Sequence, residues 1–435
     1  MPVRLTKSHL KEVAWIAAGQ AATVVGGVAA IKVLTSLLAP EQYGKFSLAL
    51  TLAIFSQQVW AGPLQQAINR YVAPYLQTQR LPELIATGTF VYLRIALVQA
   101  ILLLGGIVAA GALFLLDKDF QHALLLGVLL AAVQPLFDLP QGIYVQLRQR
   151  GKVAVYQGVS ALARPLIAAA LILALGANAV WAMLGTLIAT LVLAAVQGKG
   201  LVALGKGGAH SNELGWNLVR FAAPYATWGT LSWGVTAGDR WILGMTATVE
   251  VVGLYVVALQ IGTILPRLAG QLVSSFIVPI LNEMAGVGAE LHKVKQAVFL
   301  NTFVMLGVGA LGVIGALGVS VFGKELMALL TGPGYDKVAF ALPWFFAGGV
   351  MYEMAFLCFG VGPLLYRPQA FVLGRMTAYG VTLCLMVLLT LHWGLTGMVA
   401  AYFIGAFMHL VATGYIALKL YKEVLGRGAG QGERR

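Results

Sequence analysis

Long apolar segments recur along nearly the whole chain, and they constrain the fold more than any other feature. Of the 435 residues, 59% are hydrophobic and only 10% are charged, whereas soluble globular chains carry about 25% charged residues. Each segment has about 18 residues or more, which is enough to cross a bilayer as a helix. The sequence therefore predicts an all-α integral membrane protein with about twelve transmembrane helices. The predicted spans are 12–38, 45–70, 92–116, 121–147, 153–176, 179–203, 217–246, 251–281, 298–322, 339–365, 369–391 and 394–418.

Basic residues are distributed unevenly between the two sides of these spans. With the N-terminus inside, most of the 29 Lys and Arg residues fall in segments that we predict to be cytoplasmic. The basic residues predicted on the opposite side are Lys45, Lys118, Lys324 and Lys337. This asymmetry predicts that both termini are cytoplasmic. The net charge of +13 is not gathered on one soluble face, so it does not indicate a nucleic-acid partner.

Cysteine and histidine offer no pattern of metal or disulfide chemistry. Cys358 and Cys384 both fall within predicted spans, and the six histidines show no ligand spacing. We therefore expect no bound metal and no cofactor.

A short internal repeat divides the chain into halves. Residues 39–50 (APEQYGKFSLAL) align with residues 248–259 (TVEVVGLYVVAL), so that Gly44 matches Gly253. Six spans separate the copies, and this even number gives both halves the same orientation. Parallel repeats of this kind are a known transporter plan, in which the substrate binds between the halves. The predicted boundaries are 1–208 for the N-terminal six-helix lobe, 209–422 for the C-terminal six-helix lobe and 423–435 for a disordered cytoplasmic tail.

The repeated segments carry a family resemblance. The segment LLAPEQYGKFSLALTLAIF (37–55) and the segment DRWILGMTATVEVVGLYVVALQI (239–261) resemble corresponding helix junctions of oligosaccharide flippases of the polysaccharide transporter, or O-antigen, type. These belong to the multidrug/oligosaccharidyl-lipid/polysaccharide exporter superfamily. The resemblance implies a V-shaped transporter with a central cavity between its lobes. It also implies that the protein flips a polyprenyl-pyrophosphate-linked oligosaccharide to the outer leaflet of a bacterial cytoplasmic membrane. Membrane lipids, a polymerase and chain-length proteins would be its partners.

Four basic side chains lie inside apolar stretches: Lys32, Arg164, Arg240 and Arg267. A cation in hydrocarbon costs ~2.5–3.5 kcal/mol on insertion scales, so such residues usually face a cavity or a partner. One interpretation is that they bind the diphosphate of the lipid-linked sugar. Lys32 and Arg240 are near helix ends and could instead reach the membrane surface.

Intramembrane carboxylates offer a second role for the deeper arginines. Asp138, Asp239 and Glu353 are the candidates for ion pairs with Arg164 and Arg267. Neighbours on a helix do not face each other, so Asp239 is predicted to pair with Lys32 of the other lobe rather than with Arg240. Protonation of these carboxylates could couple transport to a proton gradient, and Na+ coupling fits equally.

Amide and indole side chains are candidates for contacts with sugar. Gln57 and Gln58 suit sugar hydroxyls, although amides also bond between membrane helices. Trp228 and Trp233 could stack on sugar rings, although membrane tryptophans more often lie at the interface or pack in the core.

Two other functions compete with the flippase. A drug exporter of the same superfamily would be expected to have an acidic cavity for cationic substrates. In this chain, the four basic residues inside apolar stretches instead outnumber the three intramembrane carboxylates. A membrane glycosyltransferase or polymerase would need a catalytic constellation in a sizeable outer loop, and the outer loops are short. We therefore predict a transporter and not an enzyme.

Overall fold

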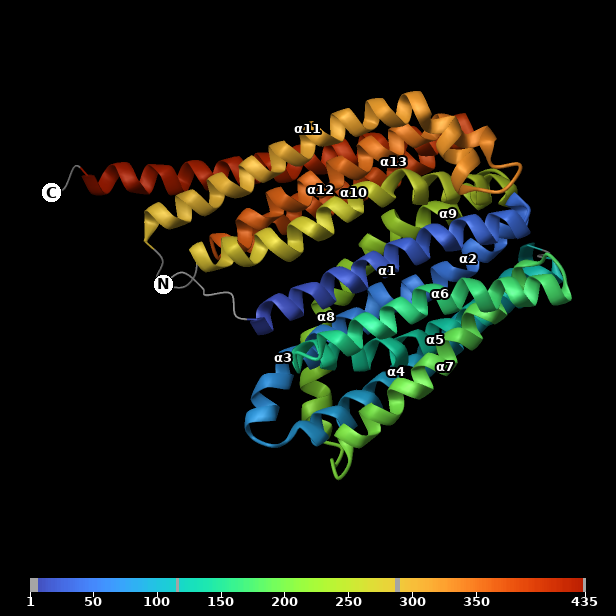
Figure 1. Ribbon diagram of the computed structural model, residues 1–435, viewed down its shortest axis with the longest axis horizontal. Helices are drawn as coiled ribbons and strands as arrows, with labels where there is room; N and C mark the ends of the chain where they lie inside the picture. The colour runs from blue at the N-terminus through green and yellow to red at the C-terminus, as the bar shows by residue number, and fades with distance from the viewer. Residues whose placement is uncertain (1–6, 115–116, 286–289, 433–435) are drawn as a thin grey trace. The chain divides into compact units, whose positions relative to one another are not determined.

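The computed structural model describes residues 7–114, 117–285 and 290–432, and within these ranges it contains helices and no strand (Figure 1). This confirms the predicted all-α architecture. Clustering of contacts divides the chain into two compact units. Unit 1 comprises Met1–Trp241, Val249–Gly253 and Thr331–Gly334, and unit 2 comprises Ile242–Thr248, Leu254–Leu330 and Tyr335–Arg435.

Unit 1 is a bundle of long helices in which α1 packs along α6, α5 along α7 and α2 along α5. Figure 1 shows α5, α6 and α7 running side by side. Its elements are α1 (Lys7–Leu37), α2 (Pro40–Ser56), the π turn η1 (Gln57–Ala61), α3 (Gly62–Gln77), α4 (Leu81–Phe114), α5 (Lys118–Gln146), α6 (Arg150–Leu175), α7 (Ala179–Gly205), α8 (Asn212–Trp233), the π turn η2 (Gly234–Gly238) and α9 (Asp239–Thr246), of which the part after Trp241 belongs to unit 2.

Unit 2 contains the longest helices, and α12 packs against both α11 and α13. Its elements are α10 (Val249–Met284), α11 (Leu291–Leu330), the 3₁₀ turns η3 (Asp336–Ala341) and η4 (Pro368–Phe371), α12 (Leu342–Leu364) and α13 (Val372–Gly432). The first turn of α10 packs with unit 1. α13 is two helices joined at Gly394, whose φ of 54° and ψ of −131° are not helical.

Side-chain caps and proline fix several helix starts in unit 1. The carboxylate of Asp117 accepts a hydrogen bond from the Phe120 backbone N–H at 2.8 Å and so caps α5. Asn178 caps α7 and Ser211 caps α8 in the same way. Pro40 occupies the first turn of α2, where its missing N–H costs nothing. Each cap satisfies donors that would otherwise be unpaired at the end of a membrane helix.

The described helices can be compared with the twelve predicted transmembrane spans. In the described residues, nine helical segments are long and apolar enough to cross a membrane. The continuous helical segments α2–η1–α3 and α8–η2–α9 are not among these nine, because a π turn and polar side chains interrupt each of the two. The segment Pro368–Glu423 holds two predicted spans, one on each side of Gly394. The two interrupted helices and the double segment account for the difference between nine apolar segments and twelve predicted spans.

Two helix ends in different halves of the chain have the same turn geometry. After α5, Arg148 has a φ of 57° and Gln149 donates its N–H to the carbonyl of Tyr144 at 2.8 Å. After α12, Tyr366 has a φ of 57° and Arg367 donates to Gly362 at 2.8 Å. Both are Schellman caps. The end of α3 has the same geometry, with a φ of 57° at Gln79 and a hydrogen bond of 2.8 Å from the Arg80 N–H to the Tyr75 carbonyl, so the turn is common to several helix ends and is not specific to the repeat.

The predicted lobe boundary and tail differ in detail from these units. α8 packs on α3 and η1, so the contact-defined unit 1 extends past residue 208. The division into lobes at 208/209 stays a prediction. α13 is helical as far as Gly432, where we predicted no fixed structure from residue 423. Residues 433–435 lie outside the described residues, and the disordered tail also stays a prediction.

Candidate functional site

Arg240 is a buried cation in unit 1. It lies at the start of α9, directly after the π turn η2, and only 8% of it is exposed. Its guanidinium donates to the Ser47 hydroxyl at 3.2 Å and to the Ser47 carbonyl at 3.5 Å. The Nε atom is buried without a hydrogen-bond partner. Within the described part of the chain, Arg240 forms no ion pair with a carboxylate.

Asp239 is 1% exposed and lies beside this arginine. Its carboxylate accepts a hydrogen bond from the backbone N–H of Arg240 at 2.8 Å, which fixes the first turn of α9. The predicted pairing of Asp239 with Lys32 stays a prediction. The Lys32 ammonium, on the exposed side of α1, donates to the Thr331 carbonyl at 2.6 Å.

Two π turns lie opposite each other in unit 1 and hold the predicted amides. Gln58 of η1 donates to the Thr236 hydroxyl of η2 at 3.0 Å. A Cβ added at Gly229 of α8 would collide with the Gln58 carbonyl, so glycine allows this close approach. The Oε1 atom of Gln57 is buried without a hydrogen-bond partner. Because π turns are frequent at functional sites, this pair marks the region around Arg240.

The two predicted tryptophans differ in what they contact. Trp233 donates its indole N–H to the Thr51 carbonyl at 3.1 Å and packs edge-on against Phe55, with ring centroids 5.2 Å apart. Trp228 is half-buried on α8. Trp241, which the sequence did not single out, donates to the Thr51 hydroxyl at 2.7 Å. Thr51 of α2 therefore anchors two indoles beside the π turns.

Arg164 belongs to a separate polar cluster on α5 and α6. The guanidinium donates to the Gln134 side-chain oxygen at 2.8 Å and lies over the Phe137 ring at 5.1 Å. The Gln134 amide in turn donates to both carboxylate oxygens of Asp138 at 3.0 Å. Asp138 is a predicted ion-pair partner of Arg164, and the two side chains are joined through the amide of Gln134 instead of by direct contact. The Nε atom of Arg164 is buried without a hydrogen-bond partner.

Unit 2 contains the remaining predicted pair. Arg267 is exposed on α10 after Pro266, and it interacts electrostatically with Glu353 of α12. The Glu353 carboxylate lies against Gly270, where a Cβ would collide with it. The absence of a side chain at Gly270 therefore makes room for a carboxylate between α10 and α12.

Apart from Lys32, the predicted site residues thus form three groups. One group surrounds the π turns of unit 1 and contains Gln57, Gln58, Trp228, Trp233, Asp239 and Arg240. The second joins Arg164 to Asp138. The third is Arg267 with Glu353 in unit 2.

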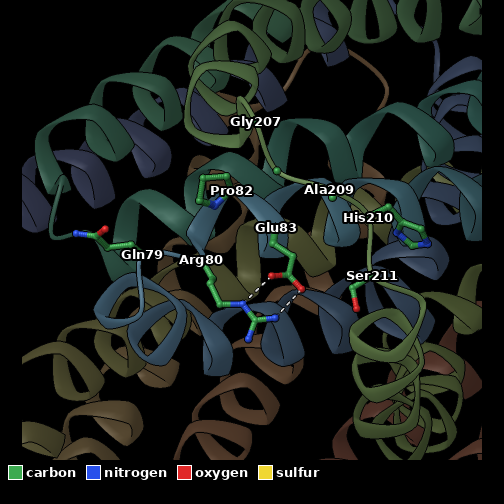
Figure 2. Close-up of a pocket in the computed structure, with 9 residues that line it drawn as sticks. Gln79, Arg80, Pro82, Glu83, Gly207, Ala209, His210 and Ser211 are labelled. Carbon is green, nitrogen blue, oxygen red and sulfur yellow. Dashed lines mark hydrogen bonds and ion pairs between the residues drawn. The ribbon is translucent and has the colours of Figure 1, made fainter.

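A cavity of about 430 Å³ lies elsewhere in unit 1, at the loops before α4 and α8. Its lining includes Gln79, Pro82, Gly207, His210 and Ser211, and none of the predicted site residues. Figure 2 shows the Arg80 guanidinium directed at the Glu83 carboxylate, with hydrogen bonds of 2.8 and 3.0 Å. The basic side chain of this cavity is therefore paired within the protein, and we do not include the cavity in the candidate site.

The sequence model of the family described as "Polysaccharide biosynthesis protein" matches residues 9–285, which is more than half of the chain. The chain belongs to this family. No curated protein matches the sequence. Membership in the family and the run of apolar helices identify the chain as a multi-pass membrane transporter of the polysaccharide biosynthesis type.

Solved structures share its fold at low sequence identity. The lipid II flippase MurJ, in an inward closed conformation, has a TM-score of 0.70 at 10% identity, and the match covers 95% of this chain and 91% of MurJ. An inward-facing multidrug resistance MATE family transporter of the MOP superfamily has a TM-score of 0.69 at 14% identity, with 94% and 96% covered. The Vibrio cholerae MATE transporter VcmN has a TM-score of 0.62 at 16% identity, with 97% of each chain covered. The chain therefore has the fold of flippases and exporters of this superfamily.

Proposed function

We propose that this protein flips a polyprenyl-pyrophosphate-linked oligosaccharide from the cytoplasmic to the outer leaflet of a bacterial cytoplasmic membrane by alternating access. Its product would feed the assembly of a cell-surface polysaccharide such as O-antigen, capsule or exopolysaccharide. The protein would act as a transporter and not as an enzyme. Family membership supports the link to polysaccharide, and the fold shared with a lipid II flippase supports a lipid-linked substrate.

The observation that carries the proposal is the environment of Arg240. Its guanidinium is buried among polar groups of α2, and its Nε atom has no hydrogen-bond partner. Burying a cation without a counter-charge is costly, because the lost hydration is not replaced. An anionic substrate that reaches Arg240 during alternation would offset this cost. A diphosphate suits the planar fork of arginine, which can hold two oxygens at once.

The other cations extend the same argument. Arg164 also has a buried Nε atom without a hydrogen-bond partner, and Arg267 is exposed on α10. Lys32 would add a fourth positive charge. We assign these residues to successive contacts with the diphosphate along its path. Gln57, Gln58, Trp228 and Trp233 would meet the sugar in the same region as Arg240.

The carboxylates would couple transport to an ion gradient. Glu353 lies in electrostatic range of Arg267, and Asp138 lies one amide away from Arg164. Asp239 adjoins Arg240. Binding of a proton or of Na+ to Glu353 or Asp138 would weaken its hold on Arg267 or Arg164 and free that arginine for the diphosphate, which gives a direct exchange between ion and substrate. Both ions fit this arrangement.

The protein would work together with other components of a polysaccharide assembly system. Its termini would lie in the cytoplasm, where the lipid-linked oligosaccharide is built. A polymerase and chain-length proteins would take the flipped product on the outer side. Membrane lipids would surround the apolar helices, among which α11 exposes many large side chains such as Phe299, Leu311 and Phe322.

The test uses purified protein in vesicles that contain a fluorescent polyprenyl-pyrophosphate-linked oligosaccharide. A membrane-impermeant quencher measures how much of the lipid has moved between leaflets. We expect Arg240→Ala and Arg267→Ala to abolish flipping while expression and folding stay normal. Lys324→Ala is the control, because Lys324 is an exposed cation on α11. Flipping at the wild-type rate in both arginine variants would refute the site, and no flipping by the wild type would refute the function.

A drug exporter is the second candidate, and the fold shared with MATE family transporters favours it. Such a protein would carry cationic compounds and depend on its carboxylates. The same vesicles loaded with a cationic dye separate the two functions. We expect no dye transport, and neutralisation of Glu353 to leave dye accumulation unchanged. Gradient-driven dye transport that requires Glu353 would favour the exporter.

A further inference from the structure

A histidine is enclosed by aromatic rings in the core of unit 2. His409 lies in the second half of α13 and is only 4% exposed. Its imidazole is stacked on the ring of Tyr379, with centroids 4.8 Å apart and planes 4° from parallel. The Tyr352 ring of α12 approaches from another side at 5.7 Å. Three helical segments therefore meet at this side chain.

The imidazole belongs to a continuous column of rings. Tyr352 contacts Tyr402 at 5.6 Å, Tyr402 contacts Phe345 at 5.2 Å, and Phe345 contacts Tyr255 at 5.5 Å. Gly348 makes room for Tyr402, because a Cβ there would come within 2.5 Å of the tyrosine ring. The column thus connects α10, α12 and both halves of α13. A change at the imidazole would be transmitted through directly packed rings.

One nitrogen of this imidazole has no hydrogen-bond partner. The Nδ1 atom of His409 is buried and unsatisfied. Buried polar atoms are nearly always paired, so an exception requires an explanation. Ionisable side chains inside a membrane segment are functional candidates, because burying them is costly. A packing role alone would be served better by phenylalanine, which has no nitrogen to leave unpaired.

The titratable and charged groups that face His409 come from α12 and from the first half of α13. They are Tyr352 in α12, and Tyr379 and Arg375 in the first half of α13. Arg375 interacts electrostatically with His409. No carboxylate forms an ion pair with His409 in the part of unit 2 that the structure describes. The site is therefore built for a neutral imidazole.

We propose that His409 is a proton-binding site that couples the packing of unit 2 to the proton gradient during transport. The proton adds to the lone pair of the imidazole nitrogen that carries no hydrogen, and a new N–H bond forms without any other bond breaking. The resulting cation would lie near Arg375 with no counter-charge, so the ring enclosure must rearrange to admit water or a carboxylate. Gly394, where α13 leaves helical geometry, separates Tyr379 from His409 and supplies the hinge.

This inference rests on the proposed transport function for its role, but protonation can be measured separately. Protein labelled with ¹⁵N-histidine in lipid nanodiscs is followed by NMR over pH about 3–8, because burial beside Arg375 opposes the charged imidazole and the range must extend below the one in which histidines commonly titrate. We expect one titrating imidazole signal that is absent from His409→Gln. His392→Gln is the matched control, since His392 is exposed on the same helix α13. If the His409 signal of the wild-type protein does not change over this pH range, the proposal is overturned. This outcome is read from the wild type alone and does not depend on whether the His409→Gln variant folds.

Transport gives the second measurement. In vesicles with an imposed pH gradient, we expect wild type and His392→Gln to flip the lipid-linked oligosaccharide faster than without the gradient. His409→Gln should lose this stimulation and keep the basal rate of flipping. Equal stimulation of His409→Gln and wild type would overturn the coupling. If wild type shows no flipping while the His409 signal titrates, the proposed function fails and the proton site stands.

Discussion

At the scale of single residues, one amide connects two opposite charges in unit 1. Gln134 accepts a hydrogen bond from Arg164 at 2.8 Å and donates to both oxygens of Asp138 at 3.0 Å. An amide can do both because it carries an acceptor and two donors. The charges are therefore balanced without direct contact, and either one can exchange its partner for a substrate or an ion while the amide stays in place.

Removal of this amide tests the connection. We expect Gln134→Leu to lower the free energy of unfolding by about 1–3 kcal/mol, because it leaves buried polar partners unsatisfied. The unfolding midpoint of detergent-solubilised protein measures the loss. In an Asp138→Asn background the same substitution should cost less, since the carboxylate is already neutral. An equal cost in both backgrounds would show that Gln134 does not link the two charges.

The sequence reveals such residues unequally. Arg240 and Arg164 stand out because a charge in an apolar stretch is rare and easily seen. Their partners do not stand out, since Ser47 and Gln134 are ordinary residues of their spans and Ser47 lies 193 residues from Arg240 along the chain. His409 was missed for the same reason, because nothing in its local sequence predicts Tyr379 and Tyr352 around it. Individual candidates can be predicted, but their contacts depend on tertiary packing.

At the scale of helices, the two glycines of the internal repeat meet each other. A Cβ added at Gly253 of α10 would collide with the Pro40 carbonyl, and one added at Gly44 of α2 would collide with the Val249 carbonyl. The start of α2 and the first turn of α10 thus touch through backbone alone, within unit 1. Small residues allow such close approach of membrane helices. The repeat predicted from sequence therefore corresponds to a packing motif.

This motif gives a stability prediction. We expect Gly253→Ala to lower the unfolding midpoint and slow transport, because the added methyl group would meet a backbone carbonyl that cannot rotate away. Gly307→Ala on α11 is the control, since no atom lies within 4 Å of the added Cβ. That change should raise stability by about 0.5–1 kcal/mol, as alanine favours a helix more than glycine does. Equal midpoints for the two variants would contradict the close contact.

The start of α5 makes a prediction about pH. Lys45 of α2 lies between Glu41 at 2.9 Å and Asp117 at 3.0 Å. Partial burial opposes the charge of Asp117, but the Phe120 N–H and the Lys45 ammonium outweigh it and lower the pKa of the carboxyl. A lowered pKa in the folded state means that this stabilisation is present above the unfolded pKa and is lost as pH falls through the folded one.

Asp117→Asn separates the charge from the helix cap, because asparagine caps helices as well as aspartate does. We expect the variant to unfold at a lower temperature than wild type at neutral pH. The difference should begin to shrink once the pH falls below about 4, the ordinary pKa of aspartate in the unfolded chain, and should be lost as the pH falls through the lower pKa of the folded protein. Thermal unfolding in detergent between neutral and acidic pH measures this. A difference that persists unchanged at the acidic end would contradict the ion pair.

The π turns mark the limit of prediction for helices. Hydropathy predicted one continuous span at 45–70 and another at 217–246, and both are helical. The extra residue in each turn at η1 and η2 could not be predicted, because it depends on how Gln58 and Thr236 bond across the two helices. The sequence shows the polar pair Gln57 and Gln58, but it does not show that the backbone forms a π turn there.

At the scale of the whole molecule, hydropathy was sufficient for the fold class but not for the contact-defined units. The all-α prediction follows from apolar length alone, since only helices and closed barrels satisfy the backbone in lipid. The units depend on packing, and the short segments Val249–Gly253 and Thr331–Gly334 join unit 1 although their neighbours in sequence belong to unit 2. Glycine at 253 and 332 allows these segments to approach other backbone closely.

The orientation of the molecule gives a prediction that labelling can check. The distribution of Lys and Arg places Lys118 outside and Lys152 inside, and both residues are exposed at helix starts. Cys358 and Cys384 are first replaced by serine or alanine, and a single cysteine is introduced at each lysine. A membrane-impermeant maleimide should label Lys118→Cys in intact bacterial cells and Lys152→Cys only after permeabilisation. The reverse pattern would invert the topology, and the diphosphate would then have to enter from the side on which no lipid-linked sugar is made.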